Sequence, residues 1–326
     1  MRAAVCGTYG PPSVVRIQEL PVPVLGPGQV RVRVGAAAVN FPDVLVIANR
    51  YQRTVPTPFV PGSEVAGVVL EVADDVDAFA AGDRVAATGL IGGFAEEAVF
   101  DVAGVHPVPA SVDDVHAAAF GVAHRTAAHV LRSVARVQPG EELVVLGAGG
   151  GVGLAAVQLG AHVGASVTAV ASSPAKLAVA AANGAHHLID HRAVELRAAL
   201  RELHPAGVDV VVDPVGGDLS EPALRALHWG GRFVTVGYAS GTIPSIPLNL
   251  VLLKGSQIHG FQFLDFAHHR PDEMRRNEAE LWALLAAGHV VPHIGATFAL
   301  TDVTAALDLV ARGGAIGKVV LEITPS

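Results

Sequence analysis

The sequence predicts an α/β protein in which a β-rich, barrel-type part is combined with a doubly wound parallel sheet. Three observations support this fold class. Short β-type runs bounded by Pro and Gly fill residues 1 to about 122. From Leu143 onward, strands alternate regularly with helices, which is typical of a parallel sheet covered on both faces. The chain has 326 residues, which is long for a single hydrophobic core, so we expect two domains.

The first part shows the alternation of a half-buried strand most clearly at residues 30–34, which read VRVRV. Further β-type runs cover 65–72 and 84–87, and Gly26-Pro27-Gly28 is typical of a turn. Residues 117–131 change to a helical pattern.

The alternating part begins at a buried strand, 143–146, and the helix that starts at about Val152. The elements expected after it are strand 166–171, helix 176–182, strand 187–190, helix 193–203, strand 208–213, helix 219–227, strand 231–236 and strand 256–260. A charged helix at 271–287 and an apolar stretch ending at 318–321 follow, and we assign this tail to the first part. The predicted domains are therefore 1–122 with 264–326, and 123–263.

Composition narrows the functional classes. Hydrophobic residues make up 51% of the chain and charged residues 16%, which argues against disorder. The net charge of -8 gives no support for nucleic-acid binding. The apolar runs are shorter than the roughly 20 residues of a membrane span, and the start shows no signal-peptide pattern, so we expect a soluble, cytoplasmic protein. A single cysteine, Cys6, excludes internal disulfides and multi-thiolate zinc sites.

The stretch ELVVLGAGGGVGLAAVQL places a glycine turn between a strand and a helix. Gly147, Gly150 and Gly153 follow a G-x-x-G-x-x-G spacing. Such a turn lets backbone N–H groups and a helix N-terminus approach a pyrophosphate. The alternative is a tight turn without a ligand, but strand, turn and helix stand in the order that a dinucleotide site needs.

The residues after the next strand favour NADP(H) over NAD(H). In NAD sites an acidic residue about 20 residues past the glycines binds the ribose 2′-hydroxyl. Here that strand ends at Ala171, and Ser172 and Lys176 follow, which supply donors and charge for a 2′-phosphate. His191 and Arg192 follow the third strand and could reach the same place. The alternative for Lys176 is a solvated lysine in a first helical turn.

The chain as a whole resembles the medium-chain dehydrogenase/reductase superfamily. Within it, the chain is similar to the zinc-free quinone oxidoreductases of the zeta-crystallin type. The resemblance covers residues 1–321 and rests on ordered blocks that include Ala38-Val39-Asn40-Phe41-Pro42-Asp43, Pro61-Gly62-Ser63-Glu64-Val65-Ala66-Gly67, Gly92-Gly93-Phe94-Ala95-Glu96, the glycine turn, Asp213-Pro214-Val215-Gly216-Gly217 and Gly317-Lys318-Val319-Val320-Leu321. It implies a GroES-like β-barrel catalytic domain with an inserted Rossmann domain, an active site in the cleft between them, and homodimers formed through Rossmann sheet edges that include residues 256–260.

The resemblance also implies a set of NADPH-binding residues. Thr126 would lie near the nicotinamide amide, and Lys318 belongs to the terminal Gly-Lys block. The remaining positions are Gly150, Gly151, Val152 and Gly153 at the pyrophosphate, Ser172, Lys176 and His191 at the 2′-phosphate, and Gly237, Phe261, Gln262 and Phe263 at the nicotinamide.

Zinc-dependent relatives place a cysteine where this chain has Asn40 and a histidine where it has Ser63. Neutral Asn and Ser are poor zinc ligands, so we expect no metal site, and Glu64 is then expected to be structural. Without a Lewis acid, the acceptor has to be electrophilic already, as a quinone or an α,β-unsaturated carbonyl is.

Two residues are catalytic candidates. Asn40 offers an amide donor for a carbonyl oxygen or for the cofactor ribose, or else it stabilises a turn. Tyr51 matches a tyrosine that lines the cleft in zeta-crystallin-like enzymes and could donate a proton or gate the site, or else it only packs. Water is an alternative proton source.

Arg125 departs from the family pattern, because relatives often carry an aromatic and a small residue at positions 124 and 125. It could favour an acidic or CoA-linked substrate, or it could be a surface arginine. We therefore predict an NADPH-dependent, zinc-independent oxidoreductase that reduces quinones or activated C=C bonds. The alternatives are an enoyl-thioester reductase and a non-enzymatic, NADPH-binding structural protein of the crystallin kind.

Overall fold

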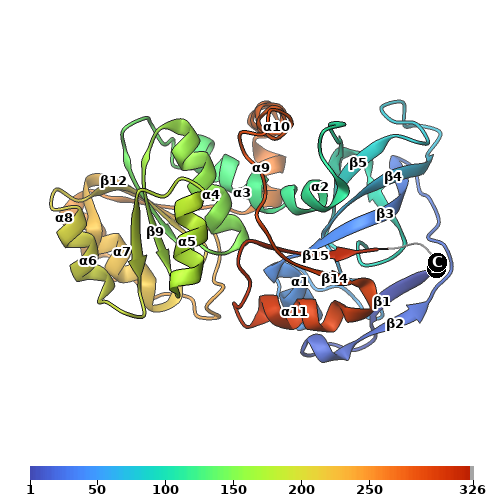
Figure 1. The fold of residues 1–326 in the computed structure, drawn as a ribbon, viewed down its shortest axis with the longest axis horizontal. Coiled ribbons are helices and arrows are strands. Elements are labelled where there is room, and N and C mark those ends of the chain that lie inside the picture. Colours follow the sequence, from blue (N-terminus) through green and yellow to red (C-terminus); the bar gives the residue numbers. More distant parts are fainter. Residues whose placement is uncertain (324–326) are drawn as a thin grey trace. The chain divides into compact units, whose positions relative to one another are not determined.

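The structure of the protein is a computed structural model that describes residues 1–323. The chain forms two compact units (Figure 1). Unit 1 comprises Met1–Val122 and Val291–Ser326, of which residues 324–326 lie outside the described part, and unit 2 comprises Ala123–Val290.

Unit 1 is built on a mixed, mainly antiparallel sheet. Seven strands form it in the order β14-β15-β3-β4-β5-β7, with β6 paired to β3, and a separate antiparallel pair is formed by β1 and β2. Their bounds are β1 Arg2–Cys6, β2 Val15–Glu19, β3 Gln29–Val39, β4 Glu64–Val72, β5 Arg84–Thr88, β6 Glu97–Asp101, β7 Val105–Pro107, β14 Ile294–Ala299 and β15 Lys318–Glu322. The long strand β3 pairs with β15, β4 and β6, so it ties the last strand of the chain into the sheet of the first part.

Among the described residues, unit 1 also contains three α-helices: α1 (Phe41–Ile47), α2 (Asp114–Phe120) and α11 (Val303–Ala311). One hydrophobic core lies between the sheet and the helices α1 and α11, and its fully buried residues include Val32, Val65 and Leu307. Burial of both chain segments in one core explains why the tail folds with the first part, as the sequence predicts.

Unit 2 contains a six-stranded sheet in which every strand pairs in parallel, in the order β10-β9-β8-β11-β12-β13. The bounds are β8 Glu142–Leu146, β9 Ser166–Ala171, β10 His187–Asp190, β11 Val208–Asp213, β12 Leu227–Thr235 and β13 Gln257–Gly260. The central strands are apolar and buried on both faces, as in Val144, Val211 and Val212. The strand order reverses between β8 and β11, which is where open α/β sheets bind ligands.

Helices cover both faces of this sheet. In Figure 1, α4 and α5 lie on one side and α6 and α7 on the other. The helices of unit 2 are α3 Ala123–His129, α4 Gly151–Val163, α5 Pro174–Ala182, α6 Leu196–Leu203, α7 Ser220–Ala226, α8 Asn249–Lys254, α9 Phe263–His269 and α10 Pro271–Ala286. This arrangement confirms the predicted fold class, a GroES-like β domain combined with a doubly wound Rossmann domain.

The second domain boundary differs from the sequence-based prediction. The first division falls between residues 122 and 123, as expected, but the second falls between 290 and 291 and not at 263/264. Residues 264–290 belong to unit 2 because α10 is anchored to α3 by buried polar contacts, including a salt bridge between Arg125 and Glu278. The predicted helix 117–131 is also interrupted, since α2 ends at Phe120 and α3 begins at Ala123.

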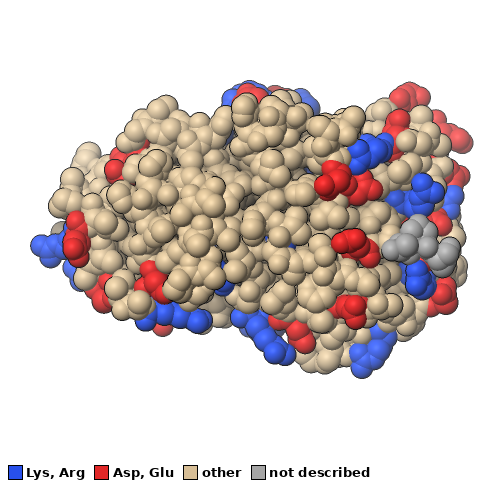
Figure 2. Space-filling view, in the orientation of Figure 1, with Lys and Arg blue, Asp and Glu red and all other residues tan. Residues whose placement is uncertain are grey.

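Within residues 1–323, no helix is both long and apolar enough to cross a membrane. On the face shown in Figure 2, Lys and Arg side chains form small groups interspersed with Asp and Glu.

Candidate functional site

The glycine turn between β8 and α4 forms a tight cradle at the switch point of the sheet. A Cβ added at Gly153 would lie 2.1 Å from the Gly147 carbonyl oxygen, and one added at Gly147 would lie 2.6 Å from Cγ2 of Val215. Gly147 has φ +62°, which favours glycine. Gly150 is the N-cap of α4 and offers no side chain to the first-turn N–H groups. These groups are therefore available to an anion, as a bound pyrophosphate requires.

The turn after β11 lies beside this cradle and is held by Asp213. One Asp213 carboxylate oxygen accepts hydrogen bonds from the backbone N–H groups of Val215 and Gly216, both at 2.8 Å. The other oxygen accepts from the Ser220 hydroxyl at 2.5 Å. Asp213 is fully buried. Its bonds fix Val215, the residue whose side chain closes on Gly147.

Cationic side chains gather at the ends of β9 and β10. The Lys176 ammonium lies 3.3 Å from the Ser172 hydroxyl, and a Cβ at Gly149 would lie 2.6 Å from Cβ and Cγ of Lys176. His191 donates its backbone N–H to the Ala171 carbonyl at 3.1 Å, which places it beside the end of β9. Lys176 thus lies across the glycine turn, with His191 and Arg192 following the adjacent strand.

Burial and mutual repulsion lower the pKa of two of these cations. The pKa of Lys176 is lowered by burial and by the charge of Arg192. The pKa of His191 is lowered by burial, by Arg192 and by Lys176, and the Asp190 carboxylate opposes this shift. A cluster in which cations destabilise one another is suited to an added anion, because the anion relieves the repulsion.

The residues expected at the nicotinamide lie at the carboxyl ends of β12 and β13 and on α3. Gly237 follows β12, and a Cβ there would meet only the Pro214 carbonyl oxygen, at 3.6 Å. Phe261 follows β13 and Phe263 begins α9, while the Gln262 side chain caps α9 by accepting the Asp265 N–H at 2.6 Å. Thr126 is buried on α3.

Arg125, next to Thr126, is not a surface residue. Its side chain is 3% exposed and forms a salt bridge with Glu278 on α10. Its guanidinium lies 4.8 Å from the centroid of the Phe263 ring. Because Glu278 neutralises its charge, Arg125 does not support the expectation of an acidic or CoA-linked substrate.

In unit 1, Asn40 is the centre of a buried polar network. Its side-chain NH₂ donates to Glu64 at 2.8 Å and to the Ser63 hydroxyl at 3.2 Å. The Lys318 ammonium donates to the side-chain oxygen Oδ1 of Asn40 and to Oε1 of Glu64, both at 2.6 Å. Lys318 is 4% exposed and Glu64 is 1% exposed. Lys318 and Asn40, which we expected at the cofactor and at the substrate, are therefore bound to each other and to Glu64.

Asp43 completes this network at the N-terminus of α1. It accepts the backbone N–H of Asn40 at 2.7 Å. Burial raises the pKa of Asp43 to about 7, and the Glu64 carboxylate adds to the rise, while the Asn40 N–H, the Ser63 hydroxyl and Lys318 oppose it. Asp43 thus brings an ionisable carboxyl, near neutrality, into contact with Asn40 and Ser63.

Tyr51 lies in the loop after α1 and packs against the hydrophobic core of unit 1. Burial raises the pKa of its phenol, and the Asp43 charge acts in the same direction against Arg53. Tyr51 and Asp43 are therefore close enough to interact electrostatically.

Sequence reasoning missed three of these polar residues. Asp43 had a detectable signal, since an Asn followed three residues later by an acid is a capping-box spacing. Asp213 was part of a recognised block but was given no role. Glu278 has no local signal, because its partner Arg125 is 153 residues away in the chain.

Comparison with known proteins gives the same two parts of the chain. The family model described as "Alcohol dehydrogenase GroES-like domain" matches residues 26–110, and the one described as "Zinc-binding dehydrogenase" matches residues 151–283. The chain is 36% identical over 324 residues to quinone oxidoreductase-like protein 2 of Bos taurus, covering 99% of this chain and 92% of that protein. The chain belongs to the zeta-crystallin-like quinone oxidoreductases of the medium-chain dehydrogenase/reductase superfamily.

Other members of the quinone oxidoreductase family agree in length and fold. Human quinone oxidoreductase is 32% identical over 325 residues, with 98% of this chain and 97% of the human protein covered. A quinone oxidoreductase structure from Pseudomonas syringae has a TM-score of 0.91 at 30% identity, covering 99% of both chains. Mycobacterial Rv1454c complexed with NADPH has a TM-score of 0.92 at 28% identity and covers all of both chains.

The zinc in one of the family descriptions does not fit the residues of this quinone oxidoreductase family member. Asn40 and Ser63 offer an amide and a hydroxyl, and both are already hydrogen-bonded. Asn40 bonds to Glu64 and Lys318, and Ser63 bonds to Asn40 and Asp43. Among residues 1–323, no three or more His, Cys, Asp and Glu side chains are grouped so as to hold a metal ion. The donor chemistry at this position is that of a hydrogen-bonded ion pair.

Proposed function

We propose that this protein is an NADPH-dependent, zinc-independent oxidoreductase that transfers hydride to a quinone or to an activated C=C bond. The observation that carries the proposal is the combination of a tight glycine turn, which leaves the first N–H groups of α4 uncapped, with the cations Lys176, His191 and Arg192 beside the end of β9. The NADPH complex of mycobacterial Rv1454c, which has the same fold, supports the choice of cofactor.

The residues of unit 2 fit the two charged groups of this nucleotide. The N–H groups at the start of α4, at Gly151, Val152 and Gly153, bind the pyrophosphate, since Gly150 leaves them uncapped. Ser172, Lys176, His191 and Arg192 bind the 2′-phosphate, with Ala171 in place of a repelling carboxylate. Bound NADPH supplies the hydride from its nicotinamide C4.

The zinc-independent part of the proposal rests on the network around Asn40. Lys318 is a fixed cation within 2.6 Å of both Asn40 and Glu64. A divalent ion would have to displace that ammonium and take neutral ligands in exchange, which is unfavourable. A substrate that is already electrophilic is therefore the best match to this site.

The proton that accompanies hydride transfer is assigned to unit 1. We infer that Tyr51 or an adjacent water donates it. Asn40 acts as the link that holds Ser63, Glu64 and Lys318 in place.

The assembly we propose is a homodimer joined through β13. This strand is the edge of the parallel sheet, and its neighbourhood carries the exposed apolar side chains of Trp229 (79% exposed), Leu252 (80%) and Leu253 (72%). An unpaired edge next to an apolar surface is suited to pairing with a second copy.

The test is oxidation of NADPH and NADH, side by side, with a 1,2-quinone, a 1,4-quinone, a 2-alkenal and an enoyl-CoA, each with and without a zinc chelator. We expect turnover with NADPH on at least one of the first three acceptors and no effect of the chelator. Loss of turnover with the chelator, or no turnover despite tight NADPH binding, would contradict the proposal.

Reduction of an enoyl thioester is the second candidate function. A segment of the polyketide synthase GfsB of Streptomyces halstedii is 37% identical to this chain over 299 residues, which is 92% of this chain and 5% of that protein. The pairing of Arg125 with Glu278 removes a charge that could have recognised the CoA phosphates. Turnover with the enoyl-CoA alone would establish this function in place of the first.

A further inference from the structure

A buried ion pair joins α3 to α10 beside the segment that follows β13. The Arg125 Nε donates to Glu278 Oε1 at 2.5 Å, and the two side chains are 3% and 10% exposed. The guanidinium lies over the ring of Phe263, at 4.8 Å from its centroid. One cation thus contacts a carboxylate from α10 and an aromatic ring from α9, both within unit 2.

His129, one helical turn after Arg125, extends the cluster. It is fully buried, and its ring centroid lies 4.9 Å from that of Phe266 and 5.8 Å from that of Phe263. Its Nε2 lies 3.7 Å from the same Glu278 oxygen that Arg125 holds. On the α10 side, the Asn277 NH₂ lies 3.1 Å from His129 Nδ1 and donates to Ser133 at 2.9 Å.

The cluster stands next to residues that the family resemblance places at the nicotinamide. Arg125 precedes Thr126 on α3, and Phe263 is the last of the three residues 261–263 after β13. α3 then continues into a π-helical turn, Val130–Val134. Such turns are frequent at functional sites.

A buried ion pair is by itself weak evidence for stability. Removing two charges from water is costly, and well-packed apolar side chains in their place are often neutral or stabilising. The planar Arg fork, by contrast, accepts only a narrow range of partner orientations. We therefore expect the Arg125–Glu278 pair to restrict how α3 and α10 are oriented relative to each other.

We propose that Arg125 and Glu278 are positioning residues for the nicotinamide end of the site. They hold α3 and the 261–263 segment in one relative geometry, so that Thr126 and the backbone of residues 261–263 present a single face to the ring. The inference rests on the proposed NADPH function and adds Glu278, a residue on α10, to the groups that determine the cofactor geometry.

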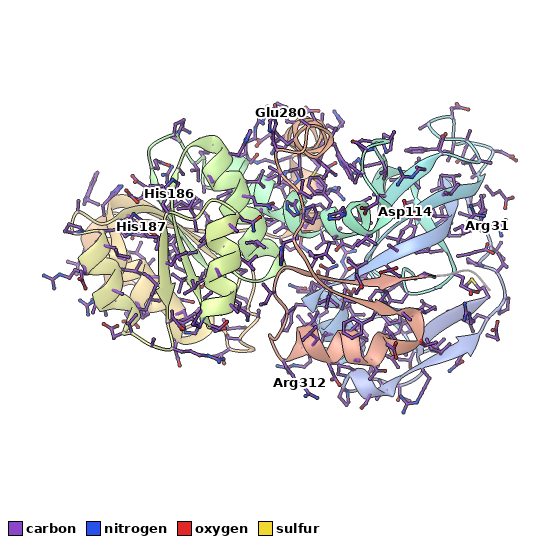
Figure 3. All side chains as sticks on the ribbon, viewed as in Figure 1. Arg31, Asp114, His186, His187, Glu280 and Arg312 are labelled. Atoms are coloured by element: carbon purple, nitrogen blue, oxygen red, sulfur yellow. The ribbon has the colours of Figure 1, made fainter. Side chains whose placement is uncertain are left out.

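The test uses the double variant R125M/E278L, which removes both charges and leaves neither unpaired. The matched control is Glu280→Gln. Glu280, labelled in Figure 3, lies on the same helix and forms an exposed ion pair with Arg132 (side chains 50% and 43% exposed). Three ligand readouts are compared with the wild type: the dissociation constants of NADPH and of 2′,5′-ADP, which lacks the nicotinamide, and the fluorescence lifetime of bound NADPH. A fourth readout is the stereospecificity of transfer from the two C4-deuterated NADPH isomers.

The double variant is expected to bind 2′,5′-ADP as the wild type does and to bind NADPH about tenfold more weakly. It should also give a broader distribution of lifetimes and a mixture of deuterium-transfer products, whereas E280Q behaves as wild type throughout. Unchanged NADPH affinity, lifetime and stereospecificity in the double variant would overturn the inference. Equal weakening of both ligands would also overturn it, because that is the signature of general damage to unit 2.

Failure of the proposed function gives a different result. Both the proposed function and the inference are wrong if the wild type binds neither ligand. They are also wrong if it binds 2′,5′-ADP and NADPH with the same affinity and shows no stereospecificity in deuterium transfer. If the wild type binds NADPH and transfers one deuterium isomer, the function stands, and the double variant decides the role of Arg125 and Glu278.

Discussion

Asp43 shows how strongly burial can shift the pKa of a single carboxyl group. The carboxyl is 2% exposed and shares its surroundings with Glu64, another carboxylate, and with Lys318, the cation that faces them both. Two acids and one base leave the network with an excess of negative charge when all are ionised. Desolvation and the Glu64 charge therefore raise the pKa of Asp43 from 3.8 to about 7.

The substitution Asp43→Asn should change how stability depends on pH. The folded pKa lies above the unfolded one, so the contribution of protonated Asp43 is full below pH 3.8 and is lost as pH rises through about 7. Between about pH 5 and about pH 8, the wild type should lose on the order of 3 kcal/mol of stability relative to D43N. Denaturant unfolding at several pH values measures this difference.

The control for that series is Asp74→Asn, because Asp74 is exposed. Its stability curve should run parallel to that of the wild type over the whole pH range. If the D43N curve also runs parallel to the wild type, Asp43 is ionised in the folded protein and the charge balance described above is wrong.

Only the local contacts of the buried polar residues could be predicted from the sequence. The Asn40-x-x-Asp43 spacing was visible, yet nothing local shows that Glu64 and Lys318 converge on it, since Lys318 is 254 residues from Glu64. Arg125 was left open between a substrate contact and a surface position. It is buried instead, because α10 brings Glu278 to it, and a distant partner of this kind leaves no periodic signal.

Among the elements, the turn between β8 and α4 has two glycines that are needed for different reasons. Gly153 packs against the turn itself, because its Cβ would lie 2.1 Å from the Gly147 oxygen. Gly150 has room for a Cβ, whose nearest neighbour would be 3.5 Å away, and its φ of -91° suits any residue. Gly153 is therefore required by the packing of the turn, and we propose that Gly150 is required by the bound ligand.

Substituting each glycine by alanine separates the two roles. G153A forces the turn and α4 apart. We expect it to lower the free energy of unfolding by about 1–3 kcal/mol and to abolish nucleotide binding. G150A should unfold at nearly the wild-type temperature and still bind NADPH more weakly, because its methyl group would lie at the start of α4, where we propose that the pyrophosphate binds. Thermal unfolding with and without NADPH distinguishes these outcomes, and a stable G153A protein that binds normally would contradict the cradle.

Most elements of unit 2 could be predicted because their signals are local. The buried strands are short apolar runs between turn residues, so β9, β10 and β11 have the predicted bounds. The short elements of unit 1, such as β2 and α1, were not predicted, since their stability comes from long-range pairing. The charged pattern of α10 identified the helix but not its partner, which is why the second domain boundary was misplaced.

At the scale of the whole molecule, unit 2 exposes an apolar surface near β13. Leu252 and Leu253 on α8 are 80% and 72% exposed, and Trp229 on β12 is 79% exposed. These residues lie at the end of the six-stranded sheet, next to its free edge. We propose that a second copy covers them.

Leu253→Glu should convert the proposed homodimer into a monomer, because it places a charge in an apolar interface. Sedimentation velocity at micromolar concentration measures the change. Val24→Glu is the control, since Val24 is 91% exposed but lies in unit 1. A wild type that sediments as a monomer, or an L253E protein that remains a dimer, would contradict this interface.

The central claim is that the cations after β9 and β10 select NADPH, and the most direct test is the binding of NADPH and NADH to the wild type and to Lys176→Ala. We predict that the wild type binds NADPH at least about tenfold more tightly than NADH. K176A should lose about 10- to 100-fold in NADPH affinity, as expected for one charge-assisted hydrogen bond, with NADH unchanged. Equal affinity of the wild type for the two nucleotides, or a K176A protein that binds both as the wild type does, would contradict the account.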